Sequence, residues 1–279
     1  MATRKRIKSL NSSSNTSDPN SMSKRWIKTE AEIDALRESG KRLAGVVEEL
    51  LRTAAIGVST GTLGALADTL IRKAGGDPIF RGYGKAWGAP PFPAAVCVSL
   101  NNEVVHGIPD DARILADGDL LKIDIGMRYQ GMVSDMARMK IIGSPSPETE
   151  RIKSVTEQAL QAGMETLHDG SSSEEYAAAV ESVVRAAGFS CVRDLVGHGV
   201  GHELHEDPQI PNYKGSGLPN FRFVAGMTVA LEPMVNAGDY RVKIAPDGWT
   251  FQTSDGRLSG HMENSVLITA DSYEVLTGV

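Results

Sequence analysis

Apolar residues recur every three or four positions along two stretches near the start of the chain, which is the spacing of an amphipathic helix. In the first stretch, Thr29 and Glu32 have the spacing of a capping box, and the apolar positions after them are Ile33, Leu36, Leu43, Val47 and Leu50. These features predict that the folded body begins with a helix over residues 29–57. A second helix is predicted over residues 60–73, because two glycines follow it as a stop signal.

A Gly- and Pro-rich stretch at residues 78–93 predicts a loop, and short aliphatic and β-branched runs after it predict strands. These runs lie at 95–99, 120–125 and 133–142. The order then repeats, with helices predicted over 147–167 and 173–187 and strands at 189–196, 227–235, 241–244 and 261–268. Two helices followed by strands, twice over, predict an α+β fold of two similar halves that share a sheet, with the functional site between them.

Two aspartates interrupt neighbouring strand-like runs. Asp124 lies in the run that starts at Leu120, Asp135 lies in the next run, and residues 129–131 can turn the chain between them. The predicted hairpin places the two aspartates roughly opposite each other on one face. Because such carboxylates repel each other and no lysine or arginine is evidently placed to neutralise both, a bound cation is the partner that the pattern favours. The alternative is that one aspartate is solvated at a strand edge.

Two further acids lie in similar surroundings. Glu232 ends an apolar run just before Pro233, and Glu263 begins the last apolar strand. Four carboxylates carry a charge of −4, which two divalent cations would balance, so the sequence favours a two-metal site over a single ion. Oxygen donors with one imidazole suit Mn, Fe, Co or Zn.

Three of the six histidines fall within eight residues of the segment Gly-His-Gly-Val-Gly-His-Glu-Leu-His-Glu at 197–206. His202 and His205 resemble the helical motif of zinc proteases, but their spacing is three residues instead of four and the glycines disfavour a helix. The glycines also resemble a dinucleotide-binding loop, but no βαβ unit surrounds them. We interpret the segment as a loop or bulge that points imidazoles inward, with His198 as the better metal ligand, His205 able to meet a substrate and His202 in a solvated or supporting place.

These motifs, with Cys-Val-Ser-Leu-Asn-Asn-Glu-Val-Val-His-Gly-Ile-Pro at 97–109, resemble those of type I methionine aminopeptidases, which are pita-bread metallopeptidases. The motifs occur in the family's order and spacing over about residues 30–279. The resemblance implies a pita-bread fold and an enzyme that removes the initiator methionine from nascent polypeptides, whose N-termini would be the substrates.

The resemblance also implies roles for particular residues. Asp135 and Glu263 would bridge two divalent metal ions, and the complete ligand set would be Asp124, Asp135, His198, Glu232 and Glu263. His106 and His205 would contact the scissile peptide and stabilise the tetrahedral intermediate, while Glu232 would accept and pass on a proton. The pocket for the methionine side chain would be lined by Phe92, Cys97 and Trp249.

One departure from the family pattern concerns that pocket. Well-known members carry a tyrosine and a histidine where Ala89 and Pro90 stand, so the sequence predicts an altered pocket wall and an altered selectivity. Within the same fold, the alternative is a proline-directed peptidase, although such relatives usually carry a large additional N-terminal domain. From another class, the alternative is a metal-free pita-bread domain that binds RNA or protein partners, yet such a protein would be expected to have lost ligands, and all five are present.

Composition narrows the class of protein. The chain of 279 residues is 41% hydrophobic and 23% charged, with a net charge of −6, as expected for a soluble globular protein that is no general binder of polyanions such as DNA. The absence of an 18-residue apolar run excludes a membrane-spanning helix, and no secretory signal follows the basic start. Two cysteines cannot form a disulfide framework and fit a reducing, cytoplasmic location.

Residues 1–28 differ from the rest of the chain. They contain seven basic residues against one acid, a net charge of +6, and a Ser- and Asn-rich stretch with almost nothing to bury. We therefore predict a disordered basic arm at 1–28 and a single catalytic domain over 29–279. The arm is open to three readings: a solvated tail or a gene start placed upstream of Met22, a contact with RNA or the ribosome, or a mitochondrial transit peptide without apolar periodicity.

Overall fold

A computed structural model describes residues 26–84 and 90–278, and these form four helices. The helices are α3 (Glu30–Thr53), α4 (Thr60–Lys73), α5 (Pro147–Met164) and α6 (Ser173–Ala186). The predicted capping box at Thr29 is confirmed, and Ser146 and Ser172 form two more. All four predicted helices are present, but α3 ends at Thr53, before the predicted Gly57, because the backbone turns to an extended conformation at Ala54.

The strands form one large sheet and two small ones, and every pairing is antiparallel. The large sheet has the order β1-β4-β5-β14-β9-β7-β8, with β15 beside β14 and β2 beside β4. Its strands are β1 (Asp77–Pro78), β2 (Cys97–Leu100), β4 (Leu120–Tyr129), β5 (Met132–Ile141), β7 (Gly197–Gly199), β8 (Glu206–Ile210), β9 (Thr228–Leu231), β14 (Glu263–Ile268) and β15 (Tyr273–Val275).

The two small sheets each contain three strands, in the orders β13-β10-β6 and β11-β12-β3. Their strands are β3 (Glu103–Val105), β6 (Ser190–Cys191), β10 (Met234–Asn236), β11 (Val242–Ile244), β12 (Phe251–Thr253) and β13 (Ser259–His261). The prediction of one continuous strand at 227–235 is therefore wrong. The segment divides into β9 and β10 around Pro233, because proline has no N–H to donate to a sheet. The strand predicted at 189–196 shrinks to two residues.

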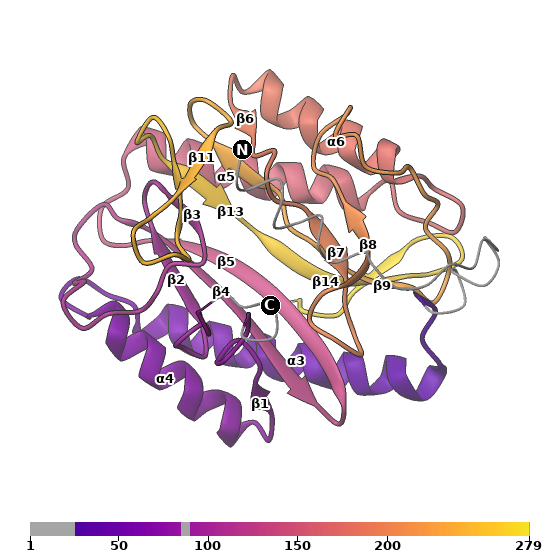
Figure 1. Cartoon of the computed structure of the whole chain (residues 1–279), viewed down its shortest axis with the longest axis horizontal. Helices are drawn as coiled ribbons and strands as arrows, with labels where there is room; N and C mark the ends of the chain where they lie inside the picture. The colour runs from indigo at the N-terminus through magenta and orange to yellow at the C-terminus, as the bar shows by residue number, and fades with distance from the viewer. Residues whose placement is uncertain (1–25, 85–89, 279) are drawn as a thin grey trace.

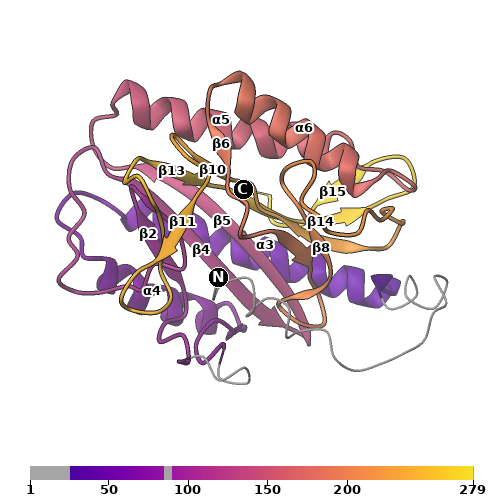
Figure 2. The same ribbon diagram turned by 45° about the horizontal axis from the view of Figure 1, so that its top comes forward.

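Each half of the molecule packs one helix pair on its own part of the sheet. Leu43 and Val47 of α3 and Leu63 of α4 form a core with Ile123 and Ile125 of β4. A second core is formed by residues of the other half, among them Ile152, Val155, Val180, Val184, Val229 and Val266. Figure 1 shows α3 and α4 below the strands and α5 and α6 above them, and the turned view of Figure 2 keeps the two pairs apart. The prediction of an α+β fold with two similar halves is confirmed.

The hairpin β4–β5 carries both aspartates and has a two-residue turn. Gln130 and Gly131 at its tip have φ angles of 49° and 83°, so both adopt the left-handed conformation of the tight turns that suit the twist of paired strands. In the register of the hairpin, Asp124 faces Ala137 and Asp135 faces Gly126. The two aspartates thus share one face, as predicted, but they are diagonal neighbours offset by two residues.

The N-terminal residues divide at Trp26. Residues 1–25 of the arm predicted at 1–28 lie outside the described residues. Trp26, Ile27 and Lys28, which the sequence placed in the arm, contact the body: Ile27 bridges to Met227 and Lys28 is only 4% exposed. Among the described helices, none combines the length and the apolarity that crossing a bilayer requires.

Candidate metal centre

One cavity between the two halves is lined by all ten residues that the sequence assigned to a site. Its volume is about 70 Å³, several times the space that one water molecule needs. The predicted residues around it are Phe92, Cys97, His106, Asp124, Asp135, His198, His205, Glu232, Trp249 and Glu263. Three lining residues, Phe80, Tyr83 and Leu204, were not predicted.

The hairpin supplies two of the carboxylates. Asp124 and Asp135 are 8% and 3% exposed, and the Cys97 thiol, which faces Asp124 across the β2–β4 pairing, hydrogen-bonds to it. Gly126, opposite Asp135, leaves room for the pocket wall, because a Cβ there would lie 2.8 Å from Phe80 Cε1. Backbone pairing therefore aims both aspartates into the cavity.

His198 reaches the cavity from β7, where glycines allow an irregular, close approach of three strands. A Cβ at Gly197 would lie 2.5 Å from the carbonyl oxygen of Ala230, and the β7–β8 register shifts immediately after His198. The bulge predicted from the glycine spacing is therefore present. The Nδ1 atom of His198 lies 2.9 Å from the Gly199 carbonyl; because a carbonyl can only accept, Nδ1 carries the proton and Nε2 is left to bind a metal.

Glu232 and Glu263 complete the ring of acids. Glu232 follows the last residue of β9, and its Oε1 lies 3.2 Å from Nε2 of His198. Glu263 begins β14 and is 2% exposed. Ligand atoms of Asp135, His198 and Glu263 all lie within 4.8 Å of one another.

The electrostatics of this ring indicate missing positive charge. Burial raises the pKa of Asp124, Glu232 and Glu263, and that of Asp135 to about 7; the neighbouring carboxylates add to the shift of Asp124 and Glu263. One oxygen each of Asp135 and Glu263 is buried without a hydrogen-bond partner. Within the described chain, no lysine or arginine pairs with any of the four carboxylates. This donor set fits two divalent cations, which would satisfy the orphaned oxygens and balance the charge.

Two buried basic side chains, on β4 and β5, donate mainly to backbone carbonyls. Lys122 donates to the carbonyls of Asn101 and Ser259, and Arg138 donates to those of Ala137, Glu263 and Thr277. Both side chains therefore hold strands in place without neutralising the acids. The alternative of a site gathered around a lysine or arginine is thereby disfavoured.

His106 and His205 both line the cavity. His106 has a φ of 60°, an uncommon left-handed conformation outside glycine, and its buried Nδ1 has no hydrogen-bond partner. His205 is an exposed residue, and its ring lies 4.2 Å from the ring of His198. Burial lowers the pKa of His106 to about 4 and, with the neighbouring His198, holds that of His205 well below its ordinary value. Both imidazoles are therefore neutral near pH 7.

The residues predicted to line a methionine pocket form an aromatic wall beside these histidines. Phe92 and Trp249 meet edge to face with ring centroids 5.3 Å apart, and the indole N–H of Trp249 donates to the Pro90 carbonyl. Ala89 lies outside the described residues. Tyr83 also lines the cavity and hydrogen-bonds to Nδ1 of His205. The altered pocket wall expected from Ala89 and Pro90 stays a prediction.

A buried histidine behind the acids was also missed. His261 is 1% exposed, neither of its ring nitrogens makes a hydrogen bond, and Nε2 lies 3.8 Å from Oε2 of Glu232. Burial, and then the charges of His106 and Lys122, lower its pKa to about 3. A neutral imidazole in this place can orient Glu232. Its position two residues before Glu263 is the one signal that the sequence offered.

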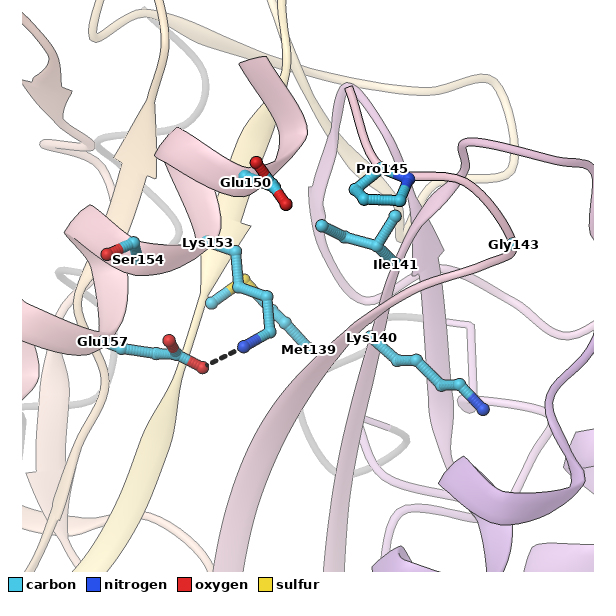
Figure 3. A pocket seen from close by; sticks show the side chains of 9 residues that line it. All are labelled: Met139, Lys140, Ile141, Gly143, Pro145, Glu150, Lys153, Ser154 and Glu157. Carbon is cyan, nitrogen blue, oxygen red and sulfur yellow. Dashed lines mark hydrogen bonds and ion pairs between the residues drawn. The ribbon is translucent and has the colours of Figure 1, made fainter. Parts of the chain in front are cut away.

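A second hollow lies between the end of β5 and α5 (Figure 3). Three of its four charged residues already have partners: Lys153 points toward Glu157, and Lys140 donates to the carbonyls of Leu51 and Ala54. None of its lining side chains has a buried polar atom without a partner. It therefore lacks the chemical features of the first cavity.

Comparison with known proteins shows which family of enzymes the chain belongs to. A model of metallopeptidase family M24 matches residues 34–270, and the chain belongs to this family of metal-dependent hydrolases. The methionine aminopeptidase of Clostridium perfringens is 41% identical over 252 residues, which are 90% of this chain and 98% of that protein. Methionine aminopeptidase 1 of Bacillus subtilis is also 41% identical, over 254 residues, which are 90% of this chain and 98% of that protein.

Solved structures agree with this assignment. The crystal structure of methionine aminopeptidase from Thermotoga maritima has a TM-score of 0.85 and 37% identity, over 91% of this chain and 99% of that one. A prolidase from Pyrococcus furiosus, at 21% identity, has a TM-score of 0.71 over 91% of this chain and 66% of that one. The second likeness concerns the fold alone and confirms the pita-bread prediction.

Metal affinity is expected to depend on pH, because the pKa of Asp135 is raised to about 7. A cation binds the carboxylate form, so below pH 7 a proton must leave Asp135 before the metal can bind. The dissociation constant of the metal is therefore expected to rise about tenfold for each pH unit below this value and for each proton displaced. Calorimetric titration of the metal-free protein with Mn²⁺ at several pH values measures this. An affinity that stays constant down to pH 5 would contradict it.

The thermal stability of the metal-free protein should change with pH in the opposite direction to the metal affinity. In the metal-free protein, the folded-state pKa of Asp135 exceeds the ordinary value of 3.8, so its contribution to stability is present below about pH 4 and is lost as the pH rises through about 7. The stabilisation produced by saturating Mn²⁺ should therefore increase over this range.

Proposed function

We propose that this protein removes the N-terminal methionine from newly synthesised polypeptides by hydrolysing their first peptide bond. The observation that carries the proposal is the buried ring of four carboxylates and His198 beside an aromatic pocket. The names of the similar bacterial aminopeptidases support the same substrate.

The residues that would hold two divalent ions in this proposal are Asp124, Asp135, His198, Glu232 and Glu263. The bound ions would supply Lewis acidity to the attacking water and the peptide carbonyl. Mn, Fe, Co or Zn would each suit the donors, and availability in the cell would decide among them.

The chain's own residues would move the proton and hold the peptide. Glu232 would accept a proton from the water molecule as the water oxygen attacks the carbonyl carbon. It would then pass this proton to the peptide nitrogen as the C–N bond breaks. The neutral imidazoles of His205 and His106 would donate hydrogen bonds to the oxygen that becomes negative. For His205 this requires a proton on Nε2, which is consistent with Nδ1 accepting from the Tyr83 hydroxyl.

The apolar pocket would select methionine. Phe92, Trp249 and Cys97, with Phe80 and Leu204, form a buried wall that suits an unbranched thioether, since sulfur packs favourably against aromatic rings. A free α-amine, uncharged when it coordinates a metal, would restrict cleavage to the first residue. Proline-directed cleavage is the second candidate, favoured only by the shared fold of the prolidase.

Peptide turnover by metal-depleted protein tests the proposal. We expect no release of methionine from Met-Ala-Ser until Mn²⁺, Fe²⁺, Co²⁺ or Zn²⁺ is added, and faster cleavage of Met-Ala-Ser than of Ala-Pro-Ser with the best metal. Faster cleavage of the proline peptide would favour the second candidate. Metal analysis showing no bound dication would contradict both.

We also propose that residues 29–279 are one catalytic domain that works in the cytoplasm. A separate proposal concerns the arm predicted at 1–28, whose basic residues within 1–25 would contact the ribosome. The net positive charge of this arm supports attraction to ribosomal RNA. Deletion of residues 1–25 should weaken co-sedimentation with ribosomes and leave Met-Ala-Ser turnover intact; unchanged co-sedimentation would refute the contact.

A further inference from the structure

The first described residues are built into the body beside the loop that carries His205. The backbone N–H of Lys28 donates to the Gly226 carbonyl at 2.8 Å, and Ile27 bridges to Met227. The lysine side chain then passes over Gly201, where a Cβ would lie 2.4 Å from Cε of Lys28. In Figure 1, the indigo start of the described chain lies on the same side of the molecule as β8 and β9.

The lysine ends in a buried ion pair with the residue after His205. Nζ of Lys28 lies 2.8 Å from Oε2 of Glu206, and the two side chains are 1% and 14% exposed. The only other acceptor that Nζ has among the described residues is the Trp26 carbonyl, at 3.5 Å. The pair joins residues 178 positions apart in the sequence.

The other oxygen of Glu206 holds the loop itself. Oε1 accepts hydrogen bonds from the backbone N–H groups of His202 and Glu203, at 2.5 Å and 2.9 Å. One carboxylate therefore ties together both ends of the turn 202–206, and Lys28 fixes that carboxylate from outside. His205 lies inside this turn, and its ring reaches His198 and Tyr83.

We propose that Lys28 and Glu206 are a positioning pair that sets the place of His205 over the reaction centre. Neither residue lines the cavity, so each acts through the turn. The inference rests on the proposed role of His205 as a hydrogen-bond donor to the substrate. It makes the N-terminal segment from Trp26 onward a working part of the site.

The test compares variants of Lys28 in the full-length, metal-saturated protein. Lys28→Met keeps most of the side-chain length and removes the charge, Lys28→Arg keeps the charge, and Lys41→Met is the matched control at an exposed lysine. We expect Lys28→Met to lower kcat for Met-Ala-Ser about 10- to 100-fold, the usual effect of losing a group that orients a functional residue. Bound metal and KM should change little, Lys28→Arg should recover part of the rate, and Lys41→Met should match the parent.

Combination with His205→Ala separates positioning from general damage. If Lys28 acts through His205, adding Lys28→Met to His205→Ala should reduce kcat no further. An equal additional loss in that background, or an undiminished kcat in Lys28→Met, would overturn the proposal. Glu206→Gln, which is nearly isosteric, carries the same test if Lys28→Met does not fold.

Hydrogen exchange gives a readout independent of activity. The amides of His202 and Glu203 should exchange faster in Lys28→Met and Glu206→Gln than in the parent and in Lys41→Met. Unchanged exchange would refute the pair even if turnover fell. Conversely, faster exchange in a protein whose parent form never releases methionine would leave the pair standing and the proposed function refuted.

Discussion

Asp135→Asn is expected to lose metal binding and nearly all turnover of Met-Ala-Ser. Asp135 is 3% exposed, shares a 4.8 Å cluster with His198 and Glu263, and has a carboxylate oxygen without a hydrogen-bond partner. An amide has nearly the same shape but no charge, so the change removes attraction to both proposed cations. Loss of one partner in a buried charge cluster costs about 3–5 kcal/mol, so metal affinity should fall by at least about 10²-fold.

Metal content after dialysis and calorimetric titration measure this loss directly. Asp77→Asn is the matched control, because Asp77 belongs to the same sheet through β1 but is exposed. The metal-free Asp135→Asn protein should be at least as stable as the metal-free parent near pH 7, since it has one buried negative charge fewer. A variant that retains stoichiometric metal and full turnover would refute the two-metal centre.

His205→Ala is expected to lower kcat about 10²- to 10³-fold while leaving metal binding intact. The ring is neutral near pH 7 and is held by Tyr83 so that Nε2 can donate to a developing oxyanion. Removal of one such donor usually costs about 2.7–4 kcal/mol in the transition state. Because this hydrogen bond strengthens during the reaction, kcat should change more than KM.

The comparison requires a histidine outside the site, and His168 serves because it is exposed and its ring nitrogen Nδ1 lies 2.8 Å from the carbonyl oxygen of Asp169. His168→Ala should match the parent in kcat and in bound metal. If His205→Ala retains the parental kcat, the mechanism proposed for the histidines is wrong, although the metal ligands would be unaffected.

The positions of the hairpin acids could be predicted from the sequence, because local rules determine them. Alternating strand residues and the turn at 130–131 determine which face Asp124 and Asp135 occupy, whatever the rest of the chain does. His198 was predictable for a related reason, since glycines on both sides of it permit a bulge and close strands. Their assignment to one metal centre also depended on the family resemblance.

Long-range contacts explain what the sequence did not reveal. Tyr83 lies in a Gly-rich stretch without periodicity, and it is placed by backbone bonds that join Gly82 and Tyr83 to Phe92. His261 becomes significant only because β13 brings it beside Glu232. Lys28 looked like one more charge of a basic arm, and its burial depends on Glu206, far along the chain. Such pairings leave no pattern within a short window of sequence.

The contacts of Arg138 have a consequence for the order in which the enzyme matures. Its guanidinium group joins the carbonyl of Glu263 to that of Thr277, and the fully buried Thr277 also accepts from the Ser265 N–H through its hydroxyl. Thr277 follows every proposed ligand in the chain, so these supports can form only after residue 277 has left the ribosome. A copy whose translation has not passed this point would thus lack the supports of the strand that begins at Glu263, and the proposed centre would be unfinished.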